Sequence, residues 1–396
     1  MSEHLNDHAA GAETAMPRSH LPRGEDFLLW PPCLQSYGYR IVDRLFATRT
    51  VRRGAAPRAL PRGREVAPRY QHQGLPRSIE DFMDLNNVAG LLVLRRGELV
   101  LERYGLGLAP SDRWSTMSTV KSMTALLVGA ALQQGAITTI DTRVVDLLPD
   151  LADSGYAQVT LRHLLTMSSG VRWSEDYGDK GSDVNRYSKS LADKVPGGVM
   201  RMLRAVPGAR TPGHAWHYNT GDTYLLGAAL CAATGRNLAD FLSDTLWQPC
   251  GMEFDAFYTL ESEGGQEIAG SRAGMALRDL GRIALLVLQD GMVGAGRVLP
   301  EGWIDTVTTR AFDVPAEFHS ASLRALGLTG YGLSWWLRDD GAAMAMGHSG
   351  QRIFVDRTSQ LAVVQLAVYP EPRHASTCEP DRDAELLSLI EALRQG

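Results

Sequence analysis

Strand-like segments lie near both ends of this 396-residue chain, and helix-like segments fill most of the length between them. Towards the N-terminus, NNVAGLLVLRRGELVLERYG has two apolar runs on either side of a turn, as in a β-hairpin. Towards the C-terminus, turn-forming residues separate three or four further strand-like runs, namely YGLSWWL, AAMAMGH, RIFVDR and LAVVQLAVY. These patterns predict one antiparallel sheet that both chain ends build.

Helical periodicity dominates the middle of the chain. It covers residues 118–134 and 221–234 and the segments LRHLLTM, NLADFLSDTLW and MALRDLGRIALLVLQDG, and it returns in the final DRDAELLSLIEALRQ. We therefore predict an α/β (α+β) fold with helices flanking the sheet and an inserted, mostly helical lobe at about 145–260. Residues 1–77 are expected to form a partly irregular N-terminal arm, and residues 78–396 the main domain. The arginine-rich part of the arm is interpreted as solvated, with an anion-binding strip as the alternative.

Charge and composition narrow the partners. A net charge of −5 gives no basic field for nucleic acid or anionic lipid, so neither partner is expected. Apolar runs stop short of the ~20 residues that span a bilayer, and the N-terminal sequence lacks the apolar core of a secretory signal, which favours a cytoplasmic location. The four scattered cysteines are interpreted as reduced thiols, and no metal or cofactor is expected. The sequence leaves a homodimer open.

The pattern Ser118-Thr-Val-Lys121 opens the predicted helix at residues 118–134. Residues three apart share a helix face, so the hydroxyl and the ammonium can meet. Serine becomes a nucleophile when a neighbouring base removes its proton, and a buried lysine with a lowered pKa can take part in that removal. Serine is also a common helix cap, and this spacing occurs by chance in many chains, so the motif alone is weak.

Two later segments strengthen the hypothesis. In PGHAWHYNTGDTYLLG, Tyr218 lies just before a helix for which Thr220 is the expected cap; a loop aromatic without a catalytic role is the alternative. In MGHSGQRIFVDR, His348, Ser349 and Gly350 are expected at a strand edge, where glycine allows close approach of a substrate. His348 is interpreted either as a substrate contact or as a solvated edge residue.

These three motifs, in this order, resemble those of the penicillin-recognising serine hydrolases, specifically the class C β-lactamase-like branch. LRHLLTMSSGV and ALRDLGRIALLVLQDG also resemble segments of that branch, and the likeness covers roughly residues 85 to 370. The family that the chain resembles most is that of the 6-aminohexanoate-dimer (nylon oligomer) hydrolases and related esterases, which share the long N-terminal arm and a segment like WSEDYGD. The resemblance implies a β-lactamase/transpeptidase-like fold.

The resemblance also implies residue roles. Ser118 would be the acylated nucleophile, and Lys121 and Tyr218 would act together as general base, with Tyr218 then protonating the leaving group. The oxyanion hole would be formed by the backbone N–H groups of Ser118 and Gln351. Substrate contacts would come from Tyr177, Asn219, Thr220, His348, Ser349 and Gly350. His348 stands where many relatives have lysine, and Thr220 stands where asparagine is usual, with Asn219 one place early; both departures argue against penicillins.

Tyr177 lies in an acidic segment with Glu175 and Asp176, interpreted as a solvated loop or as a recruiter of ammonium-bearing substrates. Trp335 and Trp336 occupy consecutive strand positions, so one should face the core, and core packing is preferred over a pocket role. The predicted function is hydrolysis of small esters or linear amides through an acyl-enzyme. The alternatives are a β-lactamase or D-alanyl-D-alanine carboxypeptidase, and a binding module that has lost catalysis.

Overall fold

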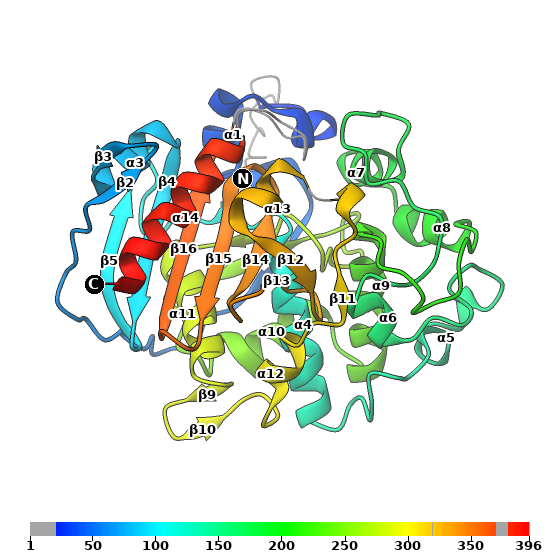
Figure 1. The fold of residues 1–396 in the computed structure, drawn as a ribbon. Coiled ribbons are helices and arrows are strands. Elements are labelled where there is room, and N and C mark those ends of the chain that lie inside the picture. The colour runs from blue at the N-terminus through cyan, green and yellow to red at the C-terminus, as the bar shows by residue number, and fades with distance from the viewer. Residues whose placement is uncertain (1–20, 319, 370–378, 396) are drawn as a thin grey trace, which may run out of the picture.

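The computed structural model describes residues 21–318, 320–369 and 379–395, and is built around an eight-stranded antiparallel sheet (Figure 1). In spatial order the strands are β11 (Phe312–Asp313), β12 (Leu328–Tyr331), β13 (Trp336–Arg338), β14 (Ala343–Gly347), β15 (Gln351–Asp356), β16 (Leu361–Ala367), β4 (Val88–Arg95) and β5 (Glu98–Tyr104). The last strand of the chain, β16, pairs with the first of this sheet, β4, opposing Val363 to Val93. The predicted sheet from both chain ends is confirmed.

Alternation along β4 explains how both faces of the sheet are covered. Leu92 and Leu94 belong to one buried cluster and Leu91 and Val93 to another. The first cluster contains apolar residues of α4 (Thr119–Gln133) and α11 (Leu277–Leu288). The second contains those of α3 (Ile79–Leu85), α13 (Ala321–Leu326) and α14 (Glu379–Gln395). The sheet is therefore the middle layer of three, with α14 crossing its near face in Figure 1.

A helical lobe lies to one side of the sheet, on the right of Figure 1. It contains α5 (Val144–Leu147), η3 (Pro149–Leu151), α6 (Leu161–Leu165), α7 (Asp183–Ala192), α8 (Gly198–Arg204) and α9 (Thr220–Thr234). The chain then returns through α10 (Leu238–Leu242), which lies beside α4 in Figure 1, and η4 (Ser243–Trp247). The predicted helices at 118–134 and 221–234 match α4 and α9 closely. The mostly apolar α4 and α9 pack together, so the lobe shares its core with the helices behind the sheet.

Shorter elements complete the fold. A second sheet has the order β1 (Thr48–Val51), β7 (Ala256–Thr259), β8 (Gly274–Met275) and β6 (Trp114–Ser115). Because β6 ends at Ser115, this small sheet fixes the chain just before Ser118. The remaining elements are η2 (Gly24–Leu29), α1 (Pro32–Gly38), α2 (Val42–Leu45), β2 (Tyr70–His72), β3 (Leu75–Arg77), β9 (Met292–Val293), β10 (Gly296–Arg297), α12 (Trp303–Val307), η5 (Ala316–Phe318) and η6 (His348–Gly350).

The described part of the N-terminal arm packs against the rest of the molecule. Phe27, Tyr39 and Phe46 are almost completely buried and belong to the main core cluster. Their rings contact one another, with Phe27 5.5 Å from both Tyr39 and Phe46 between ring centroids. Apolar burial of this size stabilises the arm in place, so these residues are a structural part of the domain rather than a solvated extension.

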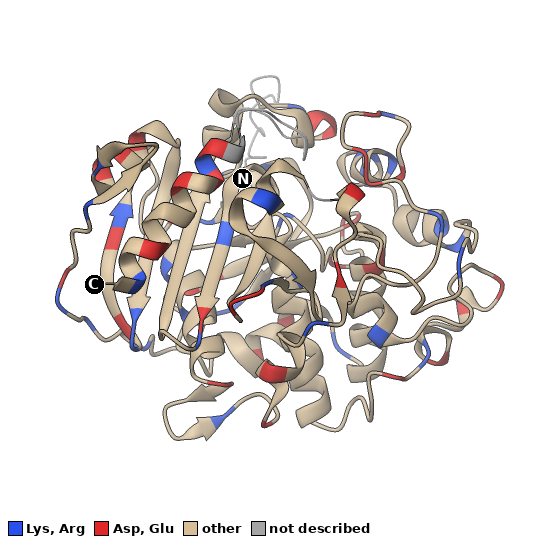
Figure 2. Cartoon of the chain, in the orientation of Figure 1, with Lys and Arg blue, Asp and Glu red and all other residues tan. Residues whose placement is uncertain are grey.

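The distribution of charge and the length of the apolar helices bear on which partners the protein can bind. Acidic and basic residues are interspersed over both the sheet and the helical lobe (Figure 2). In residues 21–318, 320–369 and 379–395, no helix combines the length and apolar character that crossing a membrane requires. The interspersed charges leave neither sign of charge concentrated on one lobe in this view.

Candidate active site

Ser118 and Lys121 meet at the start of α4, as the sequence predicts. Ser118 is the N-cap residue, and the Lys121 Nζ donates to its Oγ at 3.2 Å. The same Nζ donates to the Thr220 Oγ1 at 3.2 Å and to the Gly270 carbonyl oxygen at 2.7 Å. Lys121 is only 2% exposed, whereas Ser118 is partly open to a cavity. The amine is thus fixed by three acceptors and aimed at an accessible hydroxyl.

Burial changes the protonation of Lys121. Desolvation lowers the pKa of its ammonium group to about 8, with the charge of Arg272 acting in the same direction and that of Glu175 opposing it. An amine with this pKa has an appreciable neutral fraction near physiological pH, unlike an exposed lysine. The site therefore holds an amine that can accept the proton of Ser118.

Tyr218 lies against the same amine. The Lys121 Nζ is 5.2 Å from the centroid of the Tyr218 ring, and a hydrogen bond links the phenol to Ser118. Burial, reinforced by the charge of Glu175, raises the pKa of the phenol far above its ordinary value. The half-buried phenol therefore stays protonated, which suits a proton donor or relay and disfavours a phenolate.

The start of α9 differs from the prediction. Asn219, and not Thr220, caps the helix, since its side chain accepts from the backbone N–H groups of Gly221 and Asp222 at 2.7 and 3.2 Å. Asn219 is 1% exposed and contributes to neither cavity beside Ser118. Thr220 is free of the capping role, and its Oγ1 accepts from Lys121. An amide caps a helix as well as a hydroxyl does, so sequence alone does not choose between the two neighbours.

Glu175 is the residue whose role the sequence most underestimates. Its carboxylate accepts hydrogen bonds from the Thr220 hydroxyl and backbone N–H, from the Trp173 indole and, at 2.9 Å, from the Tyr177 hydroxyl. It is therefore a fixed acceptor beneath the cavity, whereas an acidic loop was expected to be solvated. Acidic side chains adjoin it in the sequence, and only the fold distinguishes the one that turns inward.

Tyr177 reaches the cavity. It is 7% exposed and lines the space beside Ser118, and its ring centroid lies 5.2 Å from that of His348. The His348 Nε2 lies 3.1 Å from the Leu28 carbonyl oxygen in the N-terminal arm. Tyr39 of the arm donates to the Ser349 Oγ at 3.3 Å. The arm thus holds two residues of the third motif.

His348, Ser349 and Gly350 form the short turn η6 between β14 and β15, so their expected position on a strand edge is wrong. Ser349 has a left-handed φ of 57°, and Gly350 a φ of 90°. A Cβ on Gly347, just before this turn, would lie 2.7 Å from the Thr116 carbonyl oxygen. Glycine therefore lets the end of β14 approach the segment that carries Ser118, just before the chain bends into β15.

Gln351, the first residue of β15, is completely buried. Its side-chain oxygen accepts from the Trp114 indole at 2.9 Å, and its amide nitrogen donates to the carbonyl oxygens of His348, Ser349 and Ala367. The side chain thereby joins β6, the η6 turn and β16. The backbone N–H groups of Ser118 and Gln351 stay a prediction for the oxyanion hole.

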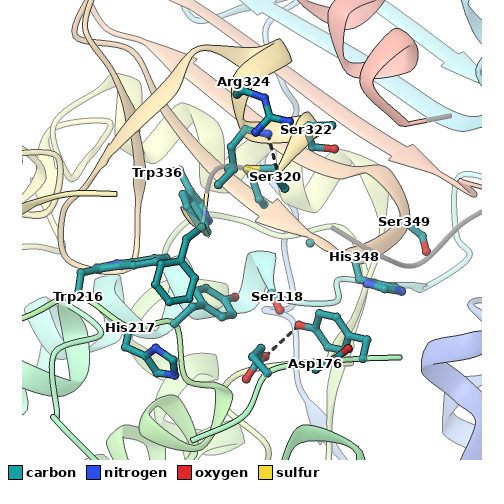
Figure 3. Close-up of a pocket in the computed structure, with 18 of the residues that line it drawn as sticks. Ser118, Asp176, Trp216, His217, Ser320, Ser322, Arg324, Trp336, His348 and Ser349 are labelled. Atoms are coloured by element: carbon teal, nitrogen blue, oxygen red, sulfur yellow. Dashed lines mark hydrogen bonds between the residues drawn. The ribbon is translucent and has the colours of Figure 1, made fainter. Parts of the chain in front are cut away.

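The cavity above Ser118 has a volume of about 460 Å³. One wall is aromatic: Trp336 stacks on Tyr218 with centroids 5.8 Å apart, and Trp216 contacts Trp336 at 5.7 Å and Phe318 at 5.4 Å. Figure 3 shows Trp216 and Trp336 on one side of Ser118 and His348 and Ser349 on the other. Trp335 is buried in the core, as expected for one of the two tryptophans, whereas Trp336 lines the cavity, which was the alternative to core packing.

Sequence reasoning missed the aromatic wall because its members come from separate elements. Trp216 precedes α9, Phe318 ends η5 and Trp336 begins β13. Each alone has the composition signal of an ordinary core residue. Their common cavity follows only from the tertiary fold.

Comparisons with known proteins identify the family of the chain. The sequence model of the family described as Beta-lactamase matches residues 75–384. The 6-aminohexanoate-dimer hydrolase of Paenarthrobacter ureafaciens is 28% identical over 304 residues, covering 74% of this chain and 76% of the relative. Esterase EstB of Burkholderia gladioli is 32% identical over 189 residues, covering 43% of this chain and 47% of the esterase.

A solved structure resembles the whole described fold. A protein from Bacillus anthracis, provisionally named a 6-aminohexanoate-dimer hydrolase, superposes with a TM-score of 0.79 and is 19% identical. The superposition covers 96% of this chain and 99% of that one. At this identity the likeness concerns the fold.

Proposed function

This chain belongs to the β-lactamase family, and we propose that it hydrolyses small esters and linear amides through an acyl-enzyme formed on Ser118. The observation that carries the proposal is the contact between the Ser118 Oγ and the Nζ of a buried lysine whose pKa is lowered to about 8, at the floor of an open cavity. The relatives named as a 6-aminohexanoate-dimer hydrolase and an esterase supply the preferred substrate classes, linear amides and esters.

In the proposed acylation step, neutral Lys121 takes the proton of Ser118 while the Oγ attacks the acyl carbon of the substrate. The developing oxyanion is stabilised by the backbone N–H groups of Ser118 and Gln351. Tyr218 then donates its proton to the departing alcohol or amine and recovers one from the Lys121 ammonium. The high pKa of Tyr218 supports this order, because the phenol enters the step protonated.

Deacylation reverses the roles. Water attacks the acyl-serine ester and gives its proton through Tyr218 to Lys121, and the Lys121 ammonium then returns a proton to the departing Ser118 Oγ, which restores the neutral amine. Thr220 keeps Lys121 in place by accepting from its Nζ, and Glu175 in turn holds Thr220 by accepting from the threonine hydroxyl. Tyr177, His348 and Ser349 are proposed as the residues that contact substrate opposite the aromatic wall. Gly350 lines neither cavity, and its φ of 90° forms the bend of the η6 turn.

A substrate panel tests the proposal. The purified chain is assayed with p-nitrophenyl acetate and butyrate, the 6-aminohexanoate linear dimer and a chromogenic cephalosporin, each beside Ser118→Ala and, as a control, Ser154→Ala in the helical lobe. We expect ester and amide turnover that Ser118→Ala abolishes and Ser154→Ala leaves intact. Efficient cephalosporin turnover with inert esters and amides would instead assign a β-lactamase or peptidase role.

If the chain is instead a binding module that has lost catalysis, the folded wild-type chain should turn over none of these substrates. A cytoplasmic location and a homodimer stay predictions beside this function. Sedimentation of the purified chain tests the dimer.

A further inference from the structure

A second, smaller cavity adjoins Ser118 on the side away from the aromatic wall. It is bounded by Ser118, Thr220 and Tyr177 of the proposed catalytic region and by Tyr187, Ser271 and Arg272. Its volume of about 20 Å³ gives room on the order of one or two water-sized atoms. None of the described residues that line it carries a carboxylate. The polar lining therefore consists of groups that can donate hydrogen bonds.

Arg272 is a buried cation without a carboxylate partner among the described residues. It is 1% exposed, and its guanidinium donates to the Ser188 Oγ at 2.6 Å. The rings of Phe27 and Phe46 lie 4.9 and 5.5 Å from its central carbon. Aromatic faces attract a cation but do not neutralise it, and an unpaired buried charge is costly to fold. Consistently, burial lowers the pKa of Arg272 to about 10.

The Arg272 Nε–H at this cavity has no hydrogen bond to any described residue, and the hydroxyls of Tyr187 and Ser271 pair only with each other. Two hydroxyls that share one hydrogen bond leave one O–H free, so two donors around this space have no acceptor. Buried donors in native proteins are nearly always paired, which indicates that an acceptor binds there. A cation together with a free hydroxyl donor favours an anionic acceptor over a neutral one.

We propose that Arg272, Tyr187 and Ser271 bind one small anionic group beside Ser118, and that substrates supply it as a carboxylate on their acyl part. The second half of this proposal rests on the proposed function. The size of the cavity suits a halide or the end of a carboxylate and is too small for a phosphate ester. Ser118 lines both cavities, so one substrate can place its acyl carbon at the Oγ and reach both.

The site also supplies a positive charge that the third motif lacks. His348, where many relatives carry lysine, is no permanent cation, and its Nε2 faces the Leu28 carbonyl oxygen. Arg272 comes from a different segment, just before β8, and supplies a permanent positive charge on that side of Ser118. The N-terminal arm contributes to the same site, since Phe27 and Phe46 cover the guanidinium.

Thermal unfolding tests binding without requiring catalysis. Melting temperatures are measured against sodium formate and sodium chloride, with total ionic strength held constant by sodium methanesulfonate, whose tetrahedral head is as bulky as that of a phosphate ester, for wild type, Arg272→Met and the exposed-arginine control Arg204→Met. We expect a saturable rise for wild type and Arg204→Met and none for Arg272→Met. Equal responses in all three chains, or no response in wild type, would overturn the anion site.

Arg272→Met is expected to fold, because replacing a buried unpaired charge by an apolar side chain of similar volume is often neutral or stabilising. If it does not fold, Tyr187→Phe gives the same test: it removes one donor and keeps the ring, so the concentration of formate at half-saturation should rise several-fold. An unchanged half-saturation in Tyr187→Phe would contradict the assigned donors.

Matched esters test the carboxylate. The kcat/KM ratio of p-nitrophenyl hydrogen succinate to p-nitrophenyl butyrate is compared between wild type and Arg272→Met, and a fall of at least about tenfold is expected, as for a charge-assisted hydrogen bond. An unchanged ratio beside an Arg272-dependent formate response would restrict the site to free anions and overturn the substrate assignment. The formate response of Ser118→Ala reports on the site even if no ester is hydrolysed.

Discussion

Burial of Lys121 sets the pH range in which Ser118 can be activated. Because the pKa of its ammonium group is about 8, the neutral amine that accepts a proton grows as pH rises through 8. We expect kcat/KM for p-nitrophenyl butyrate to rise with pH along a limb whose midpoint lies near 8, measured from pH 5.5 to 9.5. A limb near 6.5 that disappears in His348→Ala would assign the base to histidine instead.

Glu175 gives a second test at this scale, with the sign fixed by charge. Its carboxylate raises the pKa of Lys121, so Glu175→Gln removes that influence and should move the midpoint of the limb to lower pH. Asp176→Asn is the matched control, since it removes an adjacent, exposed carboxylate. A midpoint that stays in place or moves upward in Glu175→Gln, with Asp176→Asn unchanged, would contradict the described role of this carboxylate.

The residues predicted best are those whose contact is local. Ser118 and Lys121 are one helical turn apart, so their meeting follows from helix geometry. The meeting of Tyr218 with that pair comes from the family resemblance. Glu175 and Arg272 could not be predicted, because their importance depends on burial and on partners from distant segments.

Periodicity and turn signals predict several elements close to the bounds that the structure has. These are α4, α9, α11 and the hairpin of β4 and β5. The η6 turn could not be predicted in the same way. Its left-handed Ser349 is contacted by Tyr39 and Gln351, and the preceding Gly347 lies close to the segment before Ser118. A contact between segments so far apart in the chain leaves no periodic trace in the sequence.

Gly347→Ala tests that contact. The added Cβ would lie 2.7 Å from the Thr116 carbonyl oxygen and 2.9 Å from the Met117 Cβ, so the turn must move away from the nucleophile. We expect kcat to fall at least about tenfold, since misplacement of a reacting group by about 1 Å costs on the order of 100-fold. Gly296→Ala, where the Cβ would meet only an ordinary contact at 3.7 Å, should leave kcat unchanged. Equal kcat in both variants would show that the approach does not matter.

At the scale of the whole molecule, the N-terminal arm is bound into the main core although the family match starts at residue 75. The sequence indicates an arm of mixed composition, but its position depends on aromatic contacts with Arg272 and on the η6 turn, which only the assembled fold reveals. The boundary between arm and domain at residue 77 therefore stays a prediction from the sequence. The main core cluster contains residues from both sides of it.

Phe46→Ala measures how strongly the arm is integrated. Removing a ring that is 3% exposed should lower the free energy of unfolding by about 3–5 kcal/mol, as for other large aromatic truncations. Leu75→Ala, in a side chain that is 53% exposed, should cost well under 1 kcal/mol. Urea unfolding of both variants and of wild type measures these losses in the free energy of unfolding. Similar small losses would mean that the arm is only loosely attached.

The most direct test of the account is the identity of the acylated residue. The chain is mixed with p-nitrophenyl butyrate, quenched in acid within milliseconds to seconds, digested and examined by mass spectrometry. The account predicts a transient butyryl group on Ser118 that forms as fast as the first turnover and is absent from Ser118→Ala. Turnover with an acyl group on another residue, or with none while Ser118→Ala stays active, would contradict it.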